Sequence, residues 1–352
     1  MKTKNMKAFG TEAADAPLKQ MNIARREVTA KDIEIEILYC GVCHSDLHTA
    51  RNDWGGTIYP AVPGHEIVGK VTNAGSEVSK LKVGDYAAVG CMVDSCRECE
   101  NCKHDLEQYC LNGMTGTYNG NDKHSGTQTY GGYSEKIVVD EHFVLKVPSN
   151  LDLAAVAPLL CAGITTWSPL RHWKVRKGSK VAVVGLGGLG HMAIKLAKGL
   201  GAEVTLFSRT PDKKKDAMEL GADEVINSTI TDQMKSVKGK FDLIIDTIPN
   251  IHDVNPYVST LTLNGTLVLI GYLGGLEPVL NTVPMILGRK TVAGSVIGGI
   301  AETQELLDFC GEHNIVSEIE IINIQDINEA YERMLKSDVR YRFVIDMASL
   351  KK

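Results

Sequence analysis

The first part of the chain alternates apolar and polar positions in short runs. Residues 33–39 read IEIEILY, so an extended chain would place isoleucines on one face and acidic residues on the other. This pattern predicts a half-buried strand, and a stretch rich in Gly, Asn, Thr and Ser at 111–132 predicts a long loop. Further strand patterns occur at 7–10, 67–71, 83–89 and 133–147. We therefore expect an irregular, mainly β domain at the start of the chain.

From residue 180 the pattern changes to buried strands that alternate with helices. Residues 180–184 (KVAVV) are typical of a strand buried on both faces, and an apolar helical pattern extends through residue 200. Further strands are expected at 203–207, 224–226, 241–246, 266–271 and 291–297. This rhythm indicates βαβ units and a parallel sheet covered by helices on both faces.

Helices are also expected on either side of this α/β region. Residues 151–167 form one continuous apolar candidate, with Cys161 inside it. Towards the end of the chain the pattern predicts helices at 302–314 and 326–336, the second capped by Asp326, and strands at 319–324 and 342–346.

Composition narrows the possible classes of protein. With 352 residues, 43% of them hydrophobic and 23% charged, the chain is an ordinary globular sequence long enough for two domains. A net charge of −5 gives no basic field, so neither nucleic acid nor a membrane surface is an expected partner. The N-terminus leads into no apolar run and no stretch of about eighteen apolar residues occurs, so we expect a cytoplasmic protein without signal peptide or membrane span. Its nine cysteines are then reduced thiols or metal ligands.

A glycine-rich turn connects the strand at 180–184 to the helix after it. Its six residues are Gly185, Leu186, Gly187, Gly188, Leu189 and Gly190. In a dinucleotide site the first glycine allows the tight turn, the second lets the pyrophosphate approach, and the third lets helix and strand pack closely. A glycine turn can serve packing alone, but the strand before it, the helix after it and the further βα units favour a dinucleotide-binding site.

The residues after the next strand bear on which dinucleotide binds. An NAD site usually has an acidic residue there for the ribose 2′-hydroxyl. This chain instead offers hydroxyl groups, a guanidinium and an ammonium on Ser208, Arg209, Thr210 and Lys213. Such groups bind a 2′-phosphate, which favours NADP(H) over NAD(H), although a solvated basic turn has the same composition.

Four cysteines at short spacing form a second signal. The pattern C-x2-C-x2-C-x7-C comprises Cys96, Cys99, Cys102 and Cys110. Four thiolates can close a tetrahedral site with no open position, which is the form of structural zinc. An iron–sulfur cluster or four unrelated thiols are the alternatives. The surrounding loop favours a zinc-stabilised lobe at 91–111, with Cys91 outside the ligand set.

A third signal lies at residues 40–48 (CGVCHSDLH), where two thiols, two imidazoles, a hydroxyl and a carboxylate occur together. Thiolates and imidazoles are ligands of first-row metals. Further candidates beside Cys43 are His65 with Glu66, and Cys161, which lie far along the chain. Two thiolates and one imidazole would leave a fourth zinc position open, as in catalytic sites. Each also has a simpler interpretation, Cys161 as a core residue and His65 as a turn residue, and spacing alone does not group them.

Motifs along nearly the whole chain point to one family. They are CGVCHSDLH (40–48), PGHEIVG (63–69), the four-cysteine lobe, LCAGITT (160–166), the glycine turn, GRK (288–290) with GSVIG (294–298), and RYRFVID (340–346). In this order they resemble the zinc-dependent medium-chain alcohol dehydrogenases, in particular the cinnamyl-alcohol-dehydrogenase-like, NADP-dependent branch. The resemblance implies an α/β protein with a mainly β GroES-like catalytic domain and a Rossmann-type, doubly wound parallel sheet. It places these at 1–155 and 156–297, with 298–352 completing the catalytic domain.

The resemblance also implies roles for the metal-ligating residues. It assigns Cys43, His65 and Cys161 to a catalytic zinc, and the four-cysteine lobe to a structural zinc. Glu66 would lie behind the catalytic zinc as an alternative ligand. Two zinc ions per chain are therefore expected.

Further implied roles concern the proton path and the cofactor NADP(H). Ser45 would bind the substrate hydroxyl at the edge of the cofactor, and His48 and then Asp53 would continue a proton relay. The residues placed along the cofactor are Thr165, Thr247, Gly271, Ser295, Val296, Ile297 and Arg342. Arg342 is expected to approach the cofactor phosphates, and Arg340 is the alternative candidate for this contact.

The implied activity is reversible oxidation of primary alcohols to aldehydes, by a homodimer acting on small molecules. Many plant members that take bulky aromatic alcohols carry phenylalanine at the position of Val296, so the resemblance does not imply lignin-type substrates here. The expected substrates are broad, both aliphatic and aromatic. Trp54 and residues 283–287 are expected to line the pocket. The alternatives are a zinc-stabilised NADP-binding sensor and a polyol dehydrogenase of the same superfamily.

Overall fold

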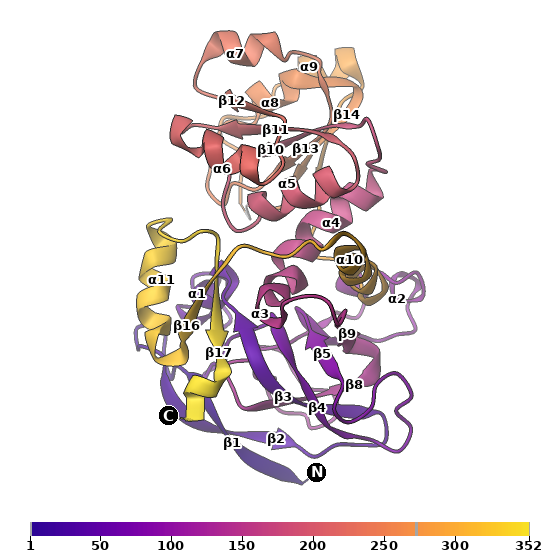
Figure 1. Cartoon of the computed structure of the whole chain (residues 1–352), viewed down its shortest axis with the longest axis vertical. Helices are drawn as coiled ribbons and strands as arrows, with labels where there is room; N and C mark the ends of the chain where they lie inside the picture. The colour runs from indigo at the N-terminus through magenta and orange to yellow at the C-terminus, as the bar shows by residue number, and fades with distance from the viewer. Residues whose placement is uncertain (1, 272–273, 352) are drawn as a thin grey trace. The chain divides into compact units, whose positions relative to one another are not determined.

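The computed structural model describes residues 2–271 and 274–351, which form two compact units. Unit 1 comprises Met1–Cys161 and Gly298–Lys352, and unit 2 comprises Ala162–Ile297. Figure 1 follows the chain through both units by colour. Residues 156–161, which the sequence analysis assigns to the second domain, belong to unit 1 because they pack on its large sheet.

Unit 1 is built on a mainly antiparallel sheet of seven strands. Its strands run in the order β16-β17-β3-β4-β5-β9, with β8 paired to β3. The central strand is β3 (Asp32–Gly41), which pairs with β4, β8 and β17. The others are β4 (Ile67–Ala74), β5 (Tyr86–Val89), β8 (Lys136–Asp140), β9 (Leu145–Lys146), β16 (Ile319–Asn323) and β17 (Arg342–Asp346). Two smaller ladders join β1 (Thr3–Gly10) to β2 (Lys19–Arg26), and β6 (Met92–Asp94) to β7 (Thr115–Gly116).

The strand expected at 33–39 is present, but the prediction of one solvated polar face is wrong at Glu34. This side chain is buried, and its carboxylate accepts hydrogen bonds from Lys136 Nζ at 2.6 Å and Thr72 Oγ1 at 2.7 Å. The reason is that β3 has neighbouring strands on both sides, whose side chains cover it. A buried carboxylate is stable there because both partners compensate its lost hydration.

The helix expected over 151–167 is broken at Cys161. Helix α3 (Leu153–Val156) leads into a 3-10 turn, and α4 (Ala162–His172) begins after the cysteine. Cys161 itself has φ −130° and ψ −68°, outside the helical region. Apolar composition predicts the helical segments but carries no signal for this break, which leaves Cys161 between the 3-10 turn and α4.

Unit 2 is a parallel six-stranded sheet in the order β12-β11-β10-β13-β14-β15. Its strands are β10 (Lys180–Val184), β11 (Glu203–Ser208), β12 (Glu224–Asn227), β13 (Phe241–Asp246), β14 (Leu261–Leu269) and β15 (Thr291–Gly294). Its further helices are α5 (Gly190–Gly199), α6 (Lys214–Glu219), α7 (Thr231–Ser236), α8 (Asn255–Thr260) and α9 (Thr282–Gly288). Ala182, Phe207, Phe241 and Leu267 belong to the core of this unit. The predicted parallel sheet is confirmed, although β14 begins earlier and β15 ends earlier than expected.

The last part of the chain returns to unit 1 with α10 (Ile300–His313), β16, α11 (Ile327–Leu335) and β17. These elements confirm the predicted order. The predicted cap is wrong, because the Asp326 side chain makes no capping hydrogen bond to α11. Its carboxylate instead accepts from the Asn323 backbone N–H at 3.3 Å, in the turn before the helix. Among the described residues, no single helix has the length and apolarity to cross a membrane, and only the bent pair Leu153–Leu160 and Ala162–His172 passes this test jointly.

Candidate active site

Cys43 lies directly before a helix that the sequence analysis missed. Residues 40–48 run from the end of β3 into α1 (His44–Ala50), with Cys43 at the N-cap position. The Asp46 carboxylate accepts a hydrogen bond from the Cys43 backbone N–H at 2.8 Å and closes a capping box. This cap fixes the backbone at Cys43 and therefore the direction of its side chain.

Four candidate ligands converge in unit 1 although they lie far apart in the sequence. The ligand atoms of Cys43, His65, Glu66 and Cys161 all lie within 4.8 Å of one another, and the two Sγ atoms are 3.9 Å apart. His65 and Glu66 directly precede β4, and Cys161 occupies the break before α4. The thiol–thiol contact lowers the pKa of Cys43 and raises the pKa of Cys161.

This donor set fits a zinc ion. Two thiols and one imidazole are ligands of catalytic zinc, and they leave one position for another group. Bonds of about 2.3 Å to a tetrahedral ion put two sulfurs about 3.8 Å apart, close to the separation of Cys43 and Cys161. Glu66 Oε2 is buried without a hydrogen-bond partner in the described part of the chain, and burial raises the pKa of Glu66 to about 7. A bound cation would compensate such an oxygen.

Glu66 is held from behind by Arg342 and Gly41. Arg342 Nη2 donates to Glu66 Oε1, and both side chains are buried. A Cβ at residue 41 would lie 1.9 Å from Glu66 Oε2, so only glycine fits there. The resemblance places Arg342 along the cofactor, whereas the structure places its guanidinium on Glu66. Arg342 Nε has no partner among the described residues, which leaves one donor for a ligand.

Asp46, to which the sequence analysis gives no role, orients His65. It is fully buried, and its Oδ1 accepts from His65 Nδ1 and from the Gly64 backbone N–H, each at 3.0 Å. The Tyr133 hydroxyl donates to Oδ2 at 3.3 Å. Because Nδ1 donates to Asp46, Nε2 is the ring nitrogen presented to a metal. An acidic residue three positions after Cys43 was the available signal, since that spacing indicates a helix cap.

The proposed proton path starts beside this cluster. The Cys43 Sγ and Ser45 Oγ atoms are 3.7 Å apart, and His48 follows Ser45 by three residues on the same face of α1. His48 Nδ1 lies 2.8 Å from Asp53 Oδ2, and the Asp53 side chain is 45% exposed. The rings of Trp54 and His48 have centroids 5.0 Å apart. The chain therefore offers a hydroxyl at the cluster, then an imidazole, then a carboxylate open to solvent.

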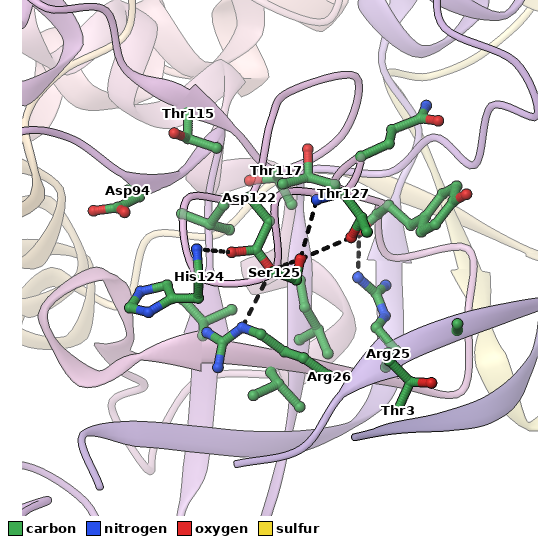
Figure 2. Close-up of a pocket in the computed structure, with 18 residues that line it drawn as sticks. Thr3, Arg25, Arg26, Asp94, Thr115, Thr117, Asp122, His124, Ser125 and Thr127 are labelled. Carbon is green, nitrogen blue, oxygen red and sulfur yellow. Dashed lines mark hydrogen bonds and ion pairs between the residues drawn. The ribbon is translucent and has the colours of Figure 1, made fainter. Parts of the chain in front are cut away.

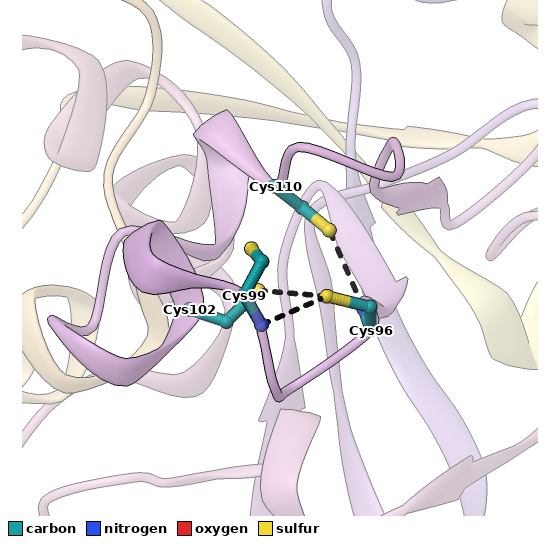
Figure 3. Close-up of side chains that lie close together, drawn as sticks. All are labelled: Cys96, Cys99, Cys102 and Cys110. Carbon is teal, nitrogen blue, oxygen red and sulfur yellow. Dashed lines mark hydrogen bonds between the residues drawn. The ribbon is translucent and has the colours of Figure 1, made fainter.

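The four-cysteine lobe forms a second cluster in unit 1 (Figure 3). The Sγ atoms of Cys96, Cys99, Cys102 and Cys110 lie within 4.8 Å of one another, and those of Cys96 and Cys102 are 3.9 Å apart. Backbone N–H groups of the lobe point at the sulfurs, and those of Glu98 and Cys99 lower the pKa of Cys96 to about 6. The short helix α2 (Glu100–Lys103) lies within the lobe. Four thiols at this separation fit one tetrahedral zinc better than a wider iron–sulfur cluster.

The glycine turn of unit 2 has the geometry that a dinucleotide needs. Gly185 adopts φ +90°, which an L side chain rarely does. A Cβ at Gly187 would meet no atom within 4 Å, so this peptide faces open space. A Cβ at Gly190 would lie 2.1 Å from Gly185 O, so the helix packs against the turn only without a side chain there. The three glycines thus fit the three expected roles.

The candidate 2′-phosphate residues follow the adjacent strand. Ser208 ends β11, and its hydroxyl donates to Thr210 O at 3.1 Å. Arg209 is exposed. Lys213 Nζ donates to Leu186 O in the glycine turn at 2.8 Å, so its ammonium lies directly beside that turn. The structure therefore gathers these basic and hydroxyl groups at the carboxyl edge of the parallel sheet.

The other predicted cofactor residues, apart from Ser45 and Arg342, lie in unit 2. Thr247 Oγ1 donates to Val184 O at 2.7 Å, and a Cβ at Gly271 would lie 2.5 Å from the Thr247 carbonyl. Ile297 adopts φ +34°, a left-handed conformation that a β-branched residue avoids unless its surroundings impose it. The remaining three are Thr165, buried in α4, and Ser295 and Val296, which follow β15.

A cavity of about 190 Å³ lies elsewhere in unit 1, among β2, β8 and the loop before residue 130 (Figure 2). None of the metal-ligating residues lines it. Arg26 pairs with both Asp122 and Asp32, and Asp94 pairs with Arg97. Its main charges are therefore satisfied internally, and the cavity is not the candidate active site.

The two-thiol, one-imidazole cluster and the glycine turn on a parallel sheet together define a zinc-dependent dehydrogenase. Two family models match, the alcohol dehydrogenase GroES-like domain over residues 29–149 and the zinc-binding dehydrogenase over residues 188–312. The chain is 53% identical to the NADP-dependent alcohol dehydrogenase C 1 of Mycolicibacterium smegmatis over 98% of each protein. It is 52% identical to the aldehyde reductase YahK of Escherichia coli, over 98% of this chain and 99% of that protein.

A solved structure of a related enzyme has the same fold. A cinnamyl alcohol dehydrogenase from Sorghum bicolor superposes with a TM-score of 0.94 at 43% identity, over 98% of each chain. The chain therefore belongs to the zinc-dependent medium-chain alcohol dehydrogenases, in the cinnamyl-alcohol-dehydrogenase-like branch. Its mainly β unit has the GroES-like fold and its parallel-sheet unit the Rossmann fold, as the resemblance implies.

Proposed function

We propose that this chain is an NADP(H)-dependent alcohol dehydrogenase that interconverts primary alcohols and aldehydes, with aliphatic and aromatic substrates. The observation that carries the proposal is the convergence of the ligand atoms of Cys43, His65 and Cys161, with Glu66 beside them, into one cluster. The names of its relatives, an NADP-dependent alcohol dehydrogenase and an aldehyde reductase, describe the two directions of this reaction.

Cys43, His65 and Cys161 would hold the catalytic zinc, with Glu66 as the nearby carboxylate, and Cys96, Cys99, Cys102 and Cys110 the structural zinc. A zinc ion in the catalytic set would supply a Lewis acid that polarises the substrate oxygen. Ser45 binds that oxygen and takes or returns the hydroxyl proton. His48 and Asp53 carry the proton towards solvent, because a buried hydroxyl cannot exchange protons with bulk water directly.

Unit 2 would bind NADP(H), which supplies or accepts the hydride. The glycine turn receives the pyrophosphate, and Ser208, Arg209, Thr210 and Lys213 bind the 2′-phosphate. Thr165, Thr247, Gly271 and residues 295–297 contribute along the cofactor. Arg342 Nε has no hydrogen-bond partner among the described residues, which supports the predicted contact of Arg342 with the cofactor phosphates. In this assignment unit 1 is the catalytic domain.

An exposed surface of unit 2 supports the proposed homodimer. Helix α9 has no buried residue, and its Val283, Ile286 and Leu287 are all more than half exposed. Strand β15 is at one end of the six-stranded sheet in the described part of the chain. A second copy related by a two-fold axis would cover both the apolar helix and the strand edge. The cytoplasmic location and the role of Trp54 and residues 283–287 in the substrate pocket stay predictions.

Steady-state assays with purified protein test the proposal. Aliphatic and aromatic aldehydes should be reduced with NADPH much faster than with NADH, and the matching alcohols oxidised with NADP⁺. Metal analysis should find two zinc ions per chain. Oxidation of sorbitol-like polyols without aldehyde reduction would favour the polyol dehydrogenase. Cofactor binding without any turnover, with one zinc or none, would favour the sensor.

A further inference from the structure

We propose that His252 is a coenzyme-specificity residue: as an imidazolium bound to Asp246, it cancels a buried negative charge at the adenosine end of the NADP(H) site. The proposal rests on the NADP(H)-binding role of unit 2 and concerns only the selection of the 2′-phosphate.

Asp246 places a carboxylate at the carboxyl edge of the parallel sheet. Asp246 is the last residue of β13, and it pairs in register with Val184, the last residue of β10. The glycine turn follows β10 directly, and β11, which leads to Ser208 and Arg209, is the other neighbour of β10. Ligands of such sheets bind outside the carboxyl ends of the strands where the strand order reverses, which here is between β10 and β13. A carboxylate therefore stands at the edge where phosphates are expected.

The hydrogen bonds of His252 define its charge. Its Nε2 lies 2.7 Å from Asp246 Oδ2, and its Nδ1 lies 2.8 Å from Asn250 O. Both contacted atoms are acceptors, so each ring nitrogen must carry a proton to bond both, and the ring is then an imidazolium. Asp246 is 1% exposed and its Oδ1 accepts from the Ile248 backbone N–H at 3.0 Å. Asp246 is therefore a buried carboxylate paired with the His252 ring.

The groups around His252 agree with this assignment. The hydrogen bond to Asp246 raises the pKa of His252 above its ordinary value, while burial and the positive charge of Arg209 oppose this. The Tyr257 ring of α8 lies 6.3 Å from the His252 ring. Val184 pairs in register with Asp246 on one side and with Phe207, which precedes Ser208 and Arg209, on the other. His252, bonded to Asp246, therefore lies at the same edge of the sheet as the proposed 2′-phosphate residues.

The consequence differs between the two coenzymes. NADP(H) carries an additional dianionic phosphate near neutral pH, which NAD(H) lacks. A bare Asp246 would repel that phosphate and offset the attraction of Arg209 and Lys213. Because the imidazolium neutralises Asp246, the carboxyl edge keeps the net positive charge that a 2′-phosphate requires.

Binding titrations of the zinc-loaded protein with NADPH and NADH, followed by nicotinamide fluorescence, test the proposal. His252→Gln should raise the Kd for NADPH at least about tenfold, or about 1.4 kcal/mol, and change the Kd for NADH less than about twofold. Adding Asp246→Asn should restore most of the NADPH affinity, since no charge then needs masking. His172→Gln, at an exposed position of the same unit, is the control and should change neither Kd. Melting temperatures without coenzyme show whether each variant is folded.

A pH series gives a readout that a purely structural role would not move. In the wild-type protein the preference for NADPH should fall as pH rises through the folded pKa of His252, and in the Gln variant this step should be absent. Equal losses for NADPH and NADH, or no recovery in the double variant, would overturn the proposal. If the wild-type protein itself bound neither coenzyme, the NADP(H) function would fail instead.

Discussion

The Asp46 carboxylate accepts a hydrogen bond from His65 Nδ1 at 3.0 Å and so links a helix cap to a metal ligand. The same carboxylate accepts from the Cys43 backbone N–H. Asp46 therefore positions two of the three proposed zinc ligands at once, although it cannot ligate the zinc itself while both its oxygens are engaged.

Replacing Asp46 by Asn should weaken zinc binding. The amide lacks the charge that favours the Nδ1–H tautomer, so we expect a metal affinity lower by about 10–100-fold. The measurement is the rate of zinc loss to a chelator, followed with metal analysis. Asp53→Asn is the matched control, because Asp53 also contacts a histidine but lies at the surface. This variant should keep its zinc. Equal chelator resistance in the Asp46 variant and the wild-type protein would contradict the positioning role.

The proton path predicts different effects for two substitutions of Ser45. Ser45→Ala removes the hydroxyl and should lower kcat by about 10² or more while zinc content is unchanged. Ser45→Thr keeps a hydroxyl and should retain most of the turnover. Stopped-flow rates of NADPH oxidation would measure both. Similar rates for the Ala and Thr variants would exclude Ser45 as the proton carrier.

Coenzyme choice should depend on Arg209. Arg209→Ala removes a guanidinium from the proposed 2′-phosphate site and should raise the KM for NADPH at least about tenfold, with little change for NADH. Lys215→Ala, on the exposed surface of α6, is the control and should change neither KM. If Arg209→Ala raised both KM values by the same factor, the 2′-phosphate assignment would be wrong.

The stability of unit 1 should depend on a buried ion pair in a pH-dependent way. Burial disfavours the Asp32 carboxylate, but hydrogen bonds from Arg26 and Thr29 lower its pKa below the ordinary value. Its stabilisation is therefore complete above the unfolded-state pKa of about 3.9 and is lost as pH falls through the lower folded pKa.

Asp32→Asn should consequently lower the free energy of unfolding by about 3–5 kcal/mol at pH 7, because Arg26 loses a buried partner. The difference in free energy of unfolding between this variant and the wild-type protein should become smaller below about pH 4. Urea unfolding of both proteins at pH 7 and below about pH 4 measures this difference in stability. Asp232→Asn, at an exposed position, is the control. A difference that stayed constant with pH would show that Asp32 contributes by packing rather than by charge.

Features coded by local spacing could be predicted from the sequence. The glycine turn and the four-cysteine lobe each lie within a few residues, so the backbone brings their atoms together whatever the rest of the chain does. The parallel sheet could also be predicted, because strands that are buried on both faces appear in the sequence as runs of apolar residues.

Features that depend on distant packing could not be predicted from the residues alone. Glu34 is buried because β4 and β8 flank its strand, and the break at Cys161 has no local signal beyond a proline nearby. The convergence of Cys43, His65 and Cys161 came from family resemblance and not from spacing. The pairing of Glu66 with Arg342 joins residues 276 positions apart in the sequence and was visible only in the structure.

The central claim is that Cys43, His65 and Cys161 hold the zinc at which alcohol and aldehyde react. Cys43→Ala tests it most directly, by NADPH-dependent aldehyde reduction and zinc content measured on the same folded sample. The account predicts one zinc ion per chain instead of two, NADPH binding retained, and aldehyde reduction abolished. A folded Cys43→Ala protein that kept two zinc ions or most of its turnover would contradict it.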